Sequence, residues 1–188
     1  MYDDYDGLIF DMDGTILDTE STHREAWRQV LLQYGLSYDE TVLIGLNGSP
    51  SWRIAQAIVT AQQSDLDPYQ LAAEKTQLLK TMLFDVVQPL PLIEVVKAYR
   101  GRRPMAVGTG SEHAMAVALL QHLGVYHHFD AIVGADDVKR HKPEPDTFLR
   151  CAELMGVAAA RCVVFEDADF GLQAARAAGM DAVDVRRL

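Results

Sequence analysis

The chain has 188 residues, which is enough for one full hydrophobic core with a small insert but not for two large domains. It carries 17 Lys and Arg against 27 Asp and Glu, a formal net charge of −10. This balance disfavours a general nucleic-acid or anionic-membrane binder, because both need a basic surface.

The first predicted element is a short buried strand over Leu8–Phe10, where both faces are apolar. Asp11 and Asp13 follow it, and residues two apart on a strand point the same way. Gly14 then breaks the strand. Two acids at the end of a buried strand need a cation, hydrogen-bond donors or a shared proton nearby.

Residues 18–87 read as a compact helical bundle without a strand. The first helix is predicted near a capping box, Thr22-x-x-Glu25. Two more helices are predicted where a cap residue precedes proline, at Ser49-Pro50 and at Asp67-Pro68.

After Gln88-Pro-Leu-Pro91 the pattern alternates between helix and strand. Helices are predicted over Leu92–Tyr99, Ser111–Leu123, Thr147–Met155 and Phe170–Ala178, and strands over Met105–Thr109, Ala131–Val133, Cys162–Glu166 and Asp181–Val185. Such alternation predicts an α/β fold with a parallel sheet covered by helices on both faces. We expect residues 1–17 and 88–188 to form this core domain and residues 18–87 to form a small all-helical cap inserted after the first strand.

Polar side chains collect where the predicted strands end, and parallel strands end at one shared edge. The residues expected there are Asp11, Asp13, Thr109, Gly110, Ser111, Lys142, Glu166 and Asp167. Four ionised carboxylates and one lysine would sum to −3, a divalent cation would bring the sum to −1, and one bound proton would bring it to zero. The pattern therefore predicts oxygen-ligated Mg²⁺, one carboxyl held neutral, and a phosphoryl ligand.

Each of these residues also has an ordinary structural explanation when it is taken alone. Glu166-Asp167 could cap a helix, Thr109 could belong to an N-cap, and Lys142 could be a solvated surface lysine. A calcium loop is disfavoured, because an EF-hand has its glycine at loop position six and a helix before it. Cys151 and Cys162 are expected to be buried packing residues.

Read together in chain order, the motifs resemble the haloacid dehalogenase superfamily of phosphatases. They are Asp11-Met-Asp13-Gly-Thr15, then Thr109 after a strand, then Lys142-Pro143, then Glu166-Asp167. The segment from Glu166 to Met180 is similar to the branch that holds phosphoglucomutases and sugar phosphatases. The resemblance implies a Mg²⁺-dependent phosphatase of small sugar phosphates, with fructose 1-phosphate as the leading substrate and 6-phosphogluconate as another.

The resemblance also implies roles for individual residues. Asp11 would be the nucleophile, ionised on the metal, and Asp13 would carry the proton that the leaving group takes. Thr109 and the Gly110 amide would hold a phosphoryl oxygen, and Lys142 would steady the transferring charge. The expected metal environment is Asp11, the Asp13 carbonyl, Glu166 and Asp167, with Asp167 as the direct ligand and Glu166 bound directly or through water.

The resemblance places the choice of substrate in the cap. The residues expected to contact substrate are Thr19, His23, Asn47, Gly48, Lys75, Gly110 and Ser111. Phosphoglucomutase relatives carry an arginine directly after Gly-Val-Ser, whereas this chain reads Gly48-Ser-Pro-Ser51 with Arg53 two residues later. That departure favours hydrolysis over a hexose phosphomutase, and a non-catalytic cation-binding protein on the same fold is the other alternative. We expect a cytoplasmic protein that binds neither nucleic acid nor membrane, with a monomer favoured over a dimer.

Overall fold

The computed structural model describes residues 2–188, and in it the strands of the main sheet are all parallel. The order across the sheet is β5-β4-β1-β6-β7. The strands are β1 (Gly7–Phe10), β4 (Met105–Gly108), β5 (Ala131–Val133), β6 (Cys162–Glu166) and β7 (Asp181–Asp184). The sequence prediction of an α/β fold with a parallel sheet is therefore confirmed, and β1 occupies the centre of the sheet.

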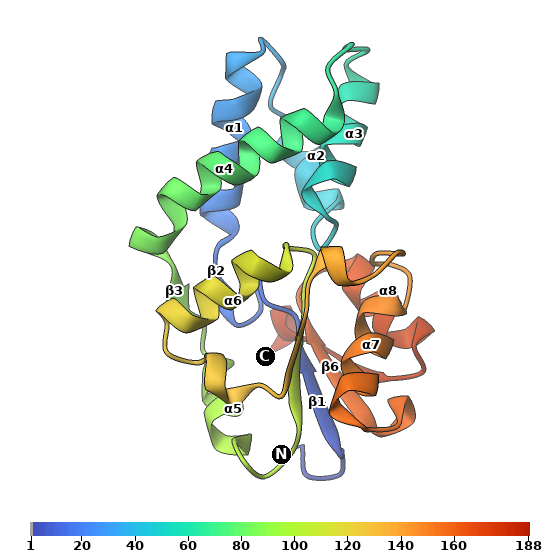
Figure 1. Ribbon diagram of the computed structural model, residues 1–188. Helices are drawn as coiled ribbons and strands as arrows, with labels where there is room; N and C mark the ends of the chain where they lie inside the picture. Colours follow the sequence, from blue (N-terminus) through green and yellow to red (C-terminus); the bar gives the residue numbers. More distant parts are fainter. Residues whose placement is uncertain (1) are drawn as a thin grey trace.

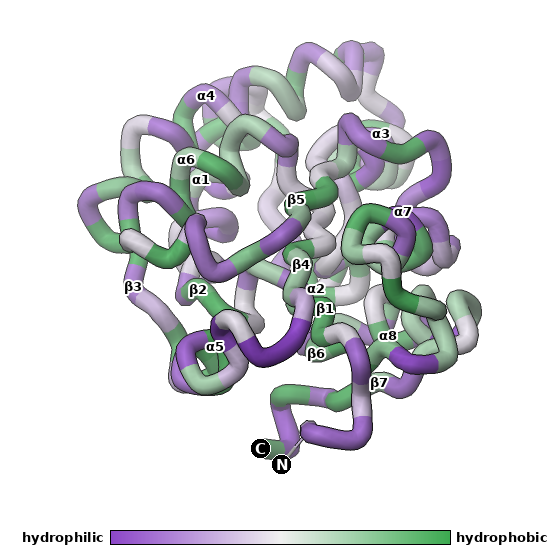
Figure 2. The backbone as a smooth tube through the Cα atoms, turned by 60° about the horizontal axis from the view of Figure 1, so that its bottom comes forward, coloured by the Kyte–Doolittle hydropathy of each residue, from purple (hydrophilic) through white to green (hydrophobic). Residues whose placement is uncertain are grey.

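Side chains of the central strand alternate between two hydrophobic layers. Leu8 and Phe10 face the helices α5 (Ile93–Tyr99) and α6 (His113–His122), whereas Ile9 faces α7 (Asp146–Met155) and α8 (Asp169–Ala177). The two helical layers lie on opposite sides of the sheet (Figure 1), and the apolar strands β1, β4 and β6 run through the middle of the molecule (Figure 2). Leu8, Ile9 and Phe10 are fully buried, which fixes where β1 ends and where Asp11 emerges.

The inserted segment is helical and lies above the sheet, as Figure 1 shows. Its helices are α1 (Glu20–Gln33), α2 (Glu40–Gly45), α3 (Ser51–Ala61) and α4 (Pro68–Val86). They enclose a second core that includes Trp27, Ile58 and Leu71, while the end of α4 packs Leu79 and Leu83 into the core of the sheet. The domain boundaries themselves stay a prediction. None of the helices in residues 2–188 is long and apolar enough to cross a membrane.

Two short strands connect this insert to the sheet domain. Residues Leu17–Asp18 (β2) pair antiparallel with Gln88–Pro89 (β3). The expectation that no strand lies within residues 18–87 is therefore wrong at Asp18. A strand of two residues is too short to show an alternating pattern in the sequence. It forms because it pairs with a segment seventy residues away.

Of the three helix starts predicted within the insert, two are wrong and one is confirmed. Helix α1 begins at Glu20 with Thr19 as its N-cap, so the capping box at Thr22 does not form. Helix α3 begins at Ser51 with Pro50 as its N-cap and no side-chain cap bond, one residue later than predicted. Helix α4 begins as expected, because the Asp67 carboxylate accepts a hydrogen bond from the Tyr69 amide at 2.9 Å.

Candidate active site at the carboxyl edge of the sheet

The centre of the site is a buried lysine held between two carboxylates. Lys142 Nζ donates to Asp11 Oδ1 at 2.6 Å and to Glu166 Oε1 at 2.7 Å. Lys142 is 1% exposed and Glu166 is 0% exposed, so water screens neither pair. The Lys142 ammonium also lies 4.8 Å from the centre of the Phe148 ring. These contacts bury Lys142 in the site, so the alternative of a solvated surface lysine does not apply.

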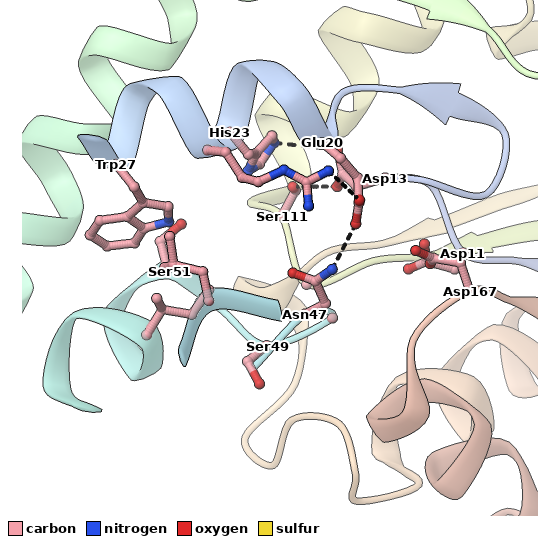
Figure 3. A pocket seen from close by; sticks show the side chains of 15 residues that line it. Asp11, Asp13, Glu20, His23, Trp27, Asn47, Ser49, Ser51, Ser111 and Asp167 are labelled. Carbon is pink, nitrogen blue, oxygen red and sulfur yellow. Dashed lines mark hydrogen bonds and ion pairs between the residues drawn. The ribbon is translucent and has the colours of Figure 1, made fainter. Parts of the chain in front are cut away.

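Asp11 and Asp167 lie together at one end of the pocket, as Figure 3 shows. One carboxylate oxygen each from Asp11, Glu166 and Asp167 falls within 4.8 Å of the others. Burial and then the negative charge of Glu166 raise the pKa of Asp11, to about 8. Burial and then the charges of Asp11 and Glu20 raise the pKa of Asp167, to about 7. Three carboxylates facing one ammonium are thus an electrostatically incomplete site that a cation would balance.

The donor set fits a hard, oxygen-preferring divalent cation such as Mg²⁺. Thr15 Oγ1 donates to Asp167 Oδ1 at 3.1 Å, which orients that carboxylate from behind. Glu166 is the least available of the three, because Oε1 binds Lys142 and Oε2 accepts from the Ala168 amide at 2.7 Å. Asp11 and Asp167 are accordingly the residues best placed to hold the ion.

Asp13 has a different environment, although it lies only two residues from Asp11. Its carboxylate accepts hydrogen bonds from Thr19 Oγ1 at 2.6 Å, Ser111 Oγ at 2.8 Å and Thr109 Oγ1 at 3.2 Å. His23 Nε2 lies 3.5 Å from Asp13 Oδ1. Burial alone would raise the pKa of Asp13, but His23 first, and then the hydroxyls of Thr19 and Ser111, lower it. Burial thus raises the pKa of Asp11 while neighbouring donors lower the pKa of Asp13, and the transfer of a proton from Asp13 to a bound substrate stays a prediction.

A second buried lysine stands behind His23 and does not line the pocket. Lys75 Nζ lies 3.0 Å from His23 Nδ1 and 3.5 Å from Ser51 Oγ, and the side chain is 1% exposed. Burial lowers the pKa of Lys75 to about 8, and burial together with the Lys75 charge lowers the pKa of His23. Because the ammonium donates to Nδ1, the hydrogen of neutral His23 sits on Nε2, which faces Asp13.

The pocket above these groups is closed by one face of α1 and by the loop before α3. Spacings of three and four residues place Glu20, His23, Arg24 and Trp27 on that face. Glu20 accepts from Asn47 Nδ2 at 2.7 Å and from Arg24 at 3.0 Å, which ties the helix to the loop (Figure 3). Sequence reasoning had missed Glu20 and Arg24, which the helical spacing from His23 could have identified.

Most of the expected site residues are brought together in one place. Those that line the pocket are Asp11, Asp13, His23, Asn47, Gly48, Gly110, Ser111 and Asp167. Thr19 and Thr109 support Asp13 from behind, and Lys142 and Glu166 support Asp11. Lys75 reaches the pocket only through His23.

One glycine of the site was also missed. A side-chain carbon at Gly171, in the first turn of α8, would overlap the Glu166 carboxylate. The missing Cβ therefore leaves the space in which Glu166 reaches Lys142. A glycine inside a helix usually lowers stability, so a glycine within a predicted helix indicates a close approach by another group. Gly171, five residues after Glu166, is such a glycine.

Comparisons with known proteins show which family the chain is similar to. A family model described as haloacid dehalogenase-like hydrolase matches residues 5–179. The chain is 70% identical over its whole length, and over the whole length of the relative, to a fructose-1-phosphate phosphatase of Escherichia coli. It is 30% identical to a phosphorylated carbohydrates phosphatase of Thermotoga maritima, over 95% of this chain and 83% of the relative. A β-phosphoglucomutase structure from Clostridium difficile superposes with a TM-score of 0.83 at 27% identity, over 95% of this chain and 83% of that one.

Proposed function

The chain belongs to the haloacid dehalogenase-like hydrolases and is a phosphoric monoester hydrolase, and from that premise we propose that it hydrolyses small sugar phosphates through an aspartyl-phosphate intermediate with Mg²⁺ as cofactor. The observation that carries the proposal is the buried pairing of Lys142 with Asp11 and Glu166, beside Asp167 and under a closed pocket. A protein that only bound a cation would need the carboxylates but not the lysine between them.

Asp11 is the proposed nucleophile. Its carboxylate attacks phosphorus and forms an acyl phosphate, while the bond from phosphorus to the sugar oxygen breaks. Asp13 gives its proton to that leaving oxygen, then takes a proton from the water that attacks phosphorus, which releases phosphate and restores Asp11. Lys142 compensates charge on Asp11 throughout, because the ammonium is fixed at 2.6 Å from Oδ1.

The low pKa of Asp13 in the free protein is compatible with this role. A phosphoryl dianion placed between Asp11 and Asp13 adds negative charge beside the Asp13 carboxylate and raises its pKa. Thr19, Thr109 and Ser111 meanwhile hold that carboxylate in one orientation. Asp13 thus gains a proton when substrate is bound, when the reaction needs one.

The proposed metal environment is Asp11, Asp167 and the Asp13 carbonyl, with Glu166 as the outer partner that holds Lys142. When bound, Mg²⁺ would supply positive charge to the phosphoryl oxygens. Thr109 and the amide of Gly110 are the proposed phosphate holders, since the Thr109 hydroxyl already accepts from the Ser111 amide at 3.0 Å and organises the loop.

The charge of the cap side of the pocket favours a neutral sugar over a sugar acid. Among the described residues lining the pocket, the only arginine is Arg24, and Glu20 neutralises it at 3.0 Å. A second phosphate or a carboxylate on the substrate would find no unpaired cation there, which disfavours a phosphomutase and 6-phosphogluconate. Fructose 1-phosphate, which the E. coli relative is named for, presents uncharged hydroxyls to this side.

A phosphate-release screen over sugar monophosphates, with Mg²⁺ and with EDTA, tests the proposal. We expect release to be highest for fructose 1-phosphate, to stop in EDTA and to stop in Asp11→Asn. Release that survives in Asp11→Asn would refute the mechanism. An isomerised sugar phosphate formed in the presence of a hexose bisphosphate would instead identify a phosphomutase.

A further inference from the structure

One cap side chain contacts two core segments that adjoin the site. Arg53 lies in the first turn of α3, and its Nη1 donates to the carbonyl oxygen of Lys142 at 3.0 Å. The same guanidinium lies 5.5 Å from the centre of the Phe170 ring. Phe170 belongs to the first turn of α8, four residues after Glu166. Arg53 therefore bridges the loop that carries Lys142 and the first turn of α8, which follows Glu166 and Asp167 in the chain.

The residue before Arg53 docks onto the same core loop. The Trp52 ring meets His141 edge-on, with ring centres 5.8 Å apart, and stacks on Tyr69 of α4 at 5.7 Å. Two consecutive cap residues thus contact two consecutive core residues, His141 and Lys142. Figure 1 shows the start of α3 lying against the chain that leads into α7.

We propose that Arg53 is a positioning residue that links the seating of the cap to the placement of Lys142. The inference rests on the role of Lys142 in the proposed function. Asp11 and Glu166 hold the ammonium end of Lys142, and Arg53 holds its main-chain end. While α3 is docked, Lys142 is held at its main chain and at its ammonium, which keeps the ammonium in one position. When the cap moves away, the hydrogen bond from Arg53 is lost and the main chain of Lys142 is less restrained.

Arg53 does not act on the substrate directly, because it is absent from the pocket lining. A charged donor to a carbonyl is a strong hydrogen bond, and its planar guanidinium can stack on an aromatic ring at the same time. Loss of this contact should therefore lower turnover more than substrate affinity.

The kinetic test compares Arg53→Ala and Arg53→Lys with the wild type, using fructose 1-phosphate and Mg²⁺. Arg28→Ala is the matched control, since Arg28 also lies in the cap and, within residues 2–188, forms its ion pair with Glu25 on the exposed side of α1. We expect Arg53→Ala to lower kcat about tenfold with KM within about twofold. Arg53→Lys should recover most of kcat, because lysine can still donate to the carbonyl, and Arg28→Ala should match the wild type. A raised KM with unchanged kcat in Arg53→Ala would overturn the proposal.

Hydrogen exchange of the same variants gives a readout that does not depend on activity. We expect Arg53→Ala to speed amide exchange in residues 139–146, in the core, while α1 and α4 of the cap exchange as in the wild type. Unchanged exchange in that loop, or faster exchange across the whole cap, would show a merely structural residue and overturn the proposal. A wild-type protein that released no phosphate would refute the proposed function, but the exchange result would still decide the role of Arg53.

Discussion

Replacement of Lys142 by methionine should destabilise the protein strongly, because it leaves two buried carboxylates without their cation. Asp11 is 3% exposed and Glu166 is 0% exposed, and each lies within 2.7 Å of the Lys142 ammonium. Removing one partner of a buried ion pair costs about 3–5 kcal/mol. Methionine keeps most of the side-chain volume and its contact with Phe148, so the loss reports charge and not packing.

The assay is urea unfolding at neutral pH in EDTA, with Lys75→Met as the control. Lys75 is as deeply buried as Lys142, but it contacts His23 and Ser51 and forms no ion pair with a carboxylate of residues 2–188. Removing the Lys75 ammonium also removes the cost of burying it, so the free energy of unfolding of Lys75→Met should differ from that of the wild type by less than about 1 kcal/mol. A Lys142→Met loss below about 1 kcal/mol, or equal losses in the two variants, would refute the reasoning.

Two further predictions concern the closed cap and the metal site. A Cβ at Gly110 would lie 2.7 Å from the Gly48 carbonyl oxygen, so Gly110→Ala should displace the cap loop and lower kcat/KM about 100-fold. A Cβ at Gly45 would meet nothing within 4 Å, so Gly45→Ala should leave kcat/KM unchanged. Equal kcat/KM values for the two variants would contradict the close approach of Gly110 to the cap. The raised pKa values of Asp11 (about 8) and Asp167 (about 7) mean that the folded metal-free protein binds more protons than the unfolded chain above the ordinary value of 3.8. Its stability should therefore fall as pH rises from about 5 to about 8, and Mg²⁺, which binds the ionised carboxylates, should raise Tm more at the upper end; a Tm increment that is independent of pH would contradict this sign.

Much of the fold could be predicted from the sequence because each core strand is marked by a local run of apolar residues. The apolar runs at Leu8–Phe10 and Cys162–Glu166 are short, bounded and buried, and parallel strands bring their ends together. The carboxylates of the site follow from that edge alone, and the order of the motifs identified Lys142 as their partner.

The features that sequence reasoning missed depend on side-chain contacts that form only in the folded chain. Thr19 caps α1 without a capping bond, because its hydroxyl donates to Asp13 instead. Arg53 meets the Lys142 carbonyl across 89 positions of the chain. The lowered pKa of Asp13 comes from contacts with His23 of α1, with Thr19 and with Ser111 in the loop after β4, which no local pattern reveals.

Trapping a phosphoryl adduct tests the central claim most directly. In Asp13→Asn, p-nitrophenyl phosphate should still phosphorylate Asp11, because p-nitrophenolate leaves without a proton, but hydrolysis of the adduct should be slow because no base activates water. Mass spectrometry after acid quench should then find one added phosphoryl group, on the peptide that contains Asp11, and none in the double variant that also carries Asp11→Asn. An adduct on another residue, or its persistence in the double variant, would contradict the assignment of Asp11 as nucleophile.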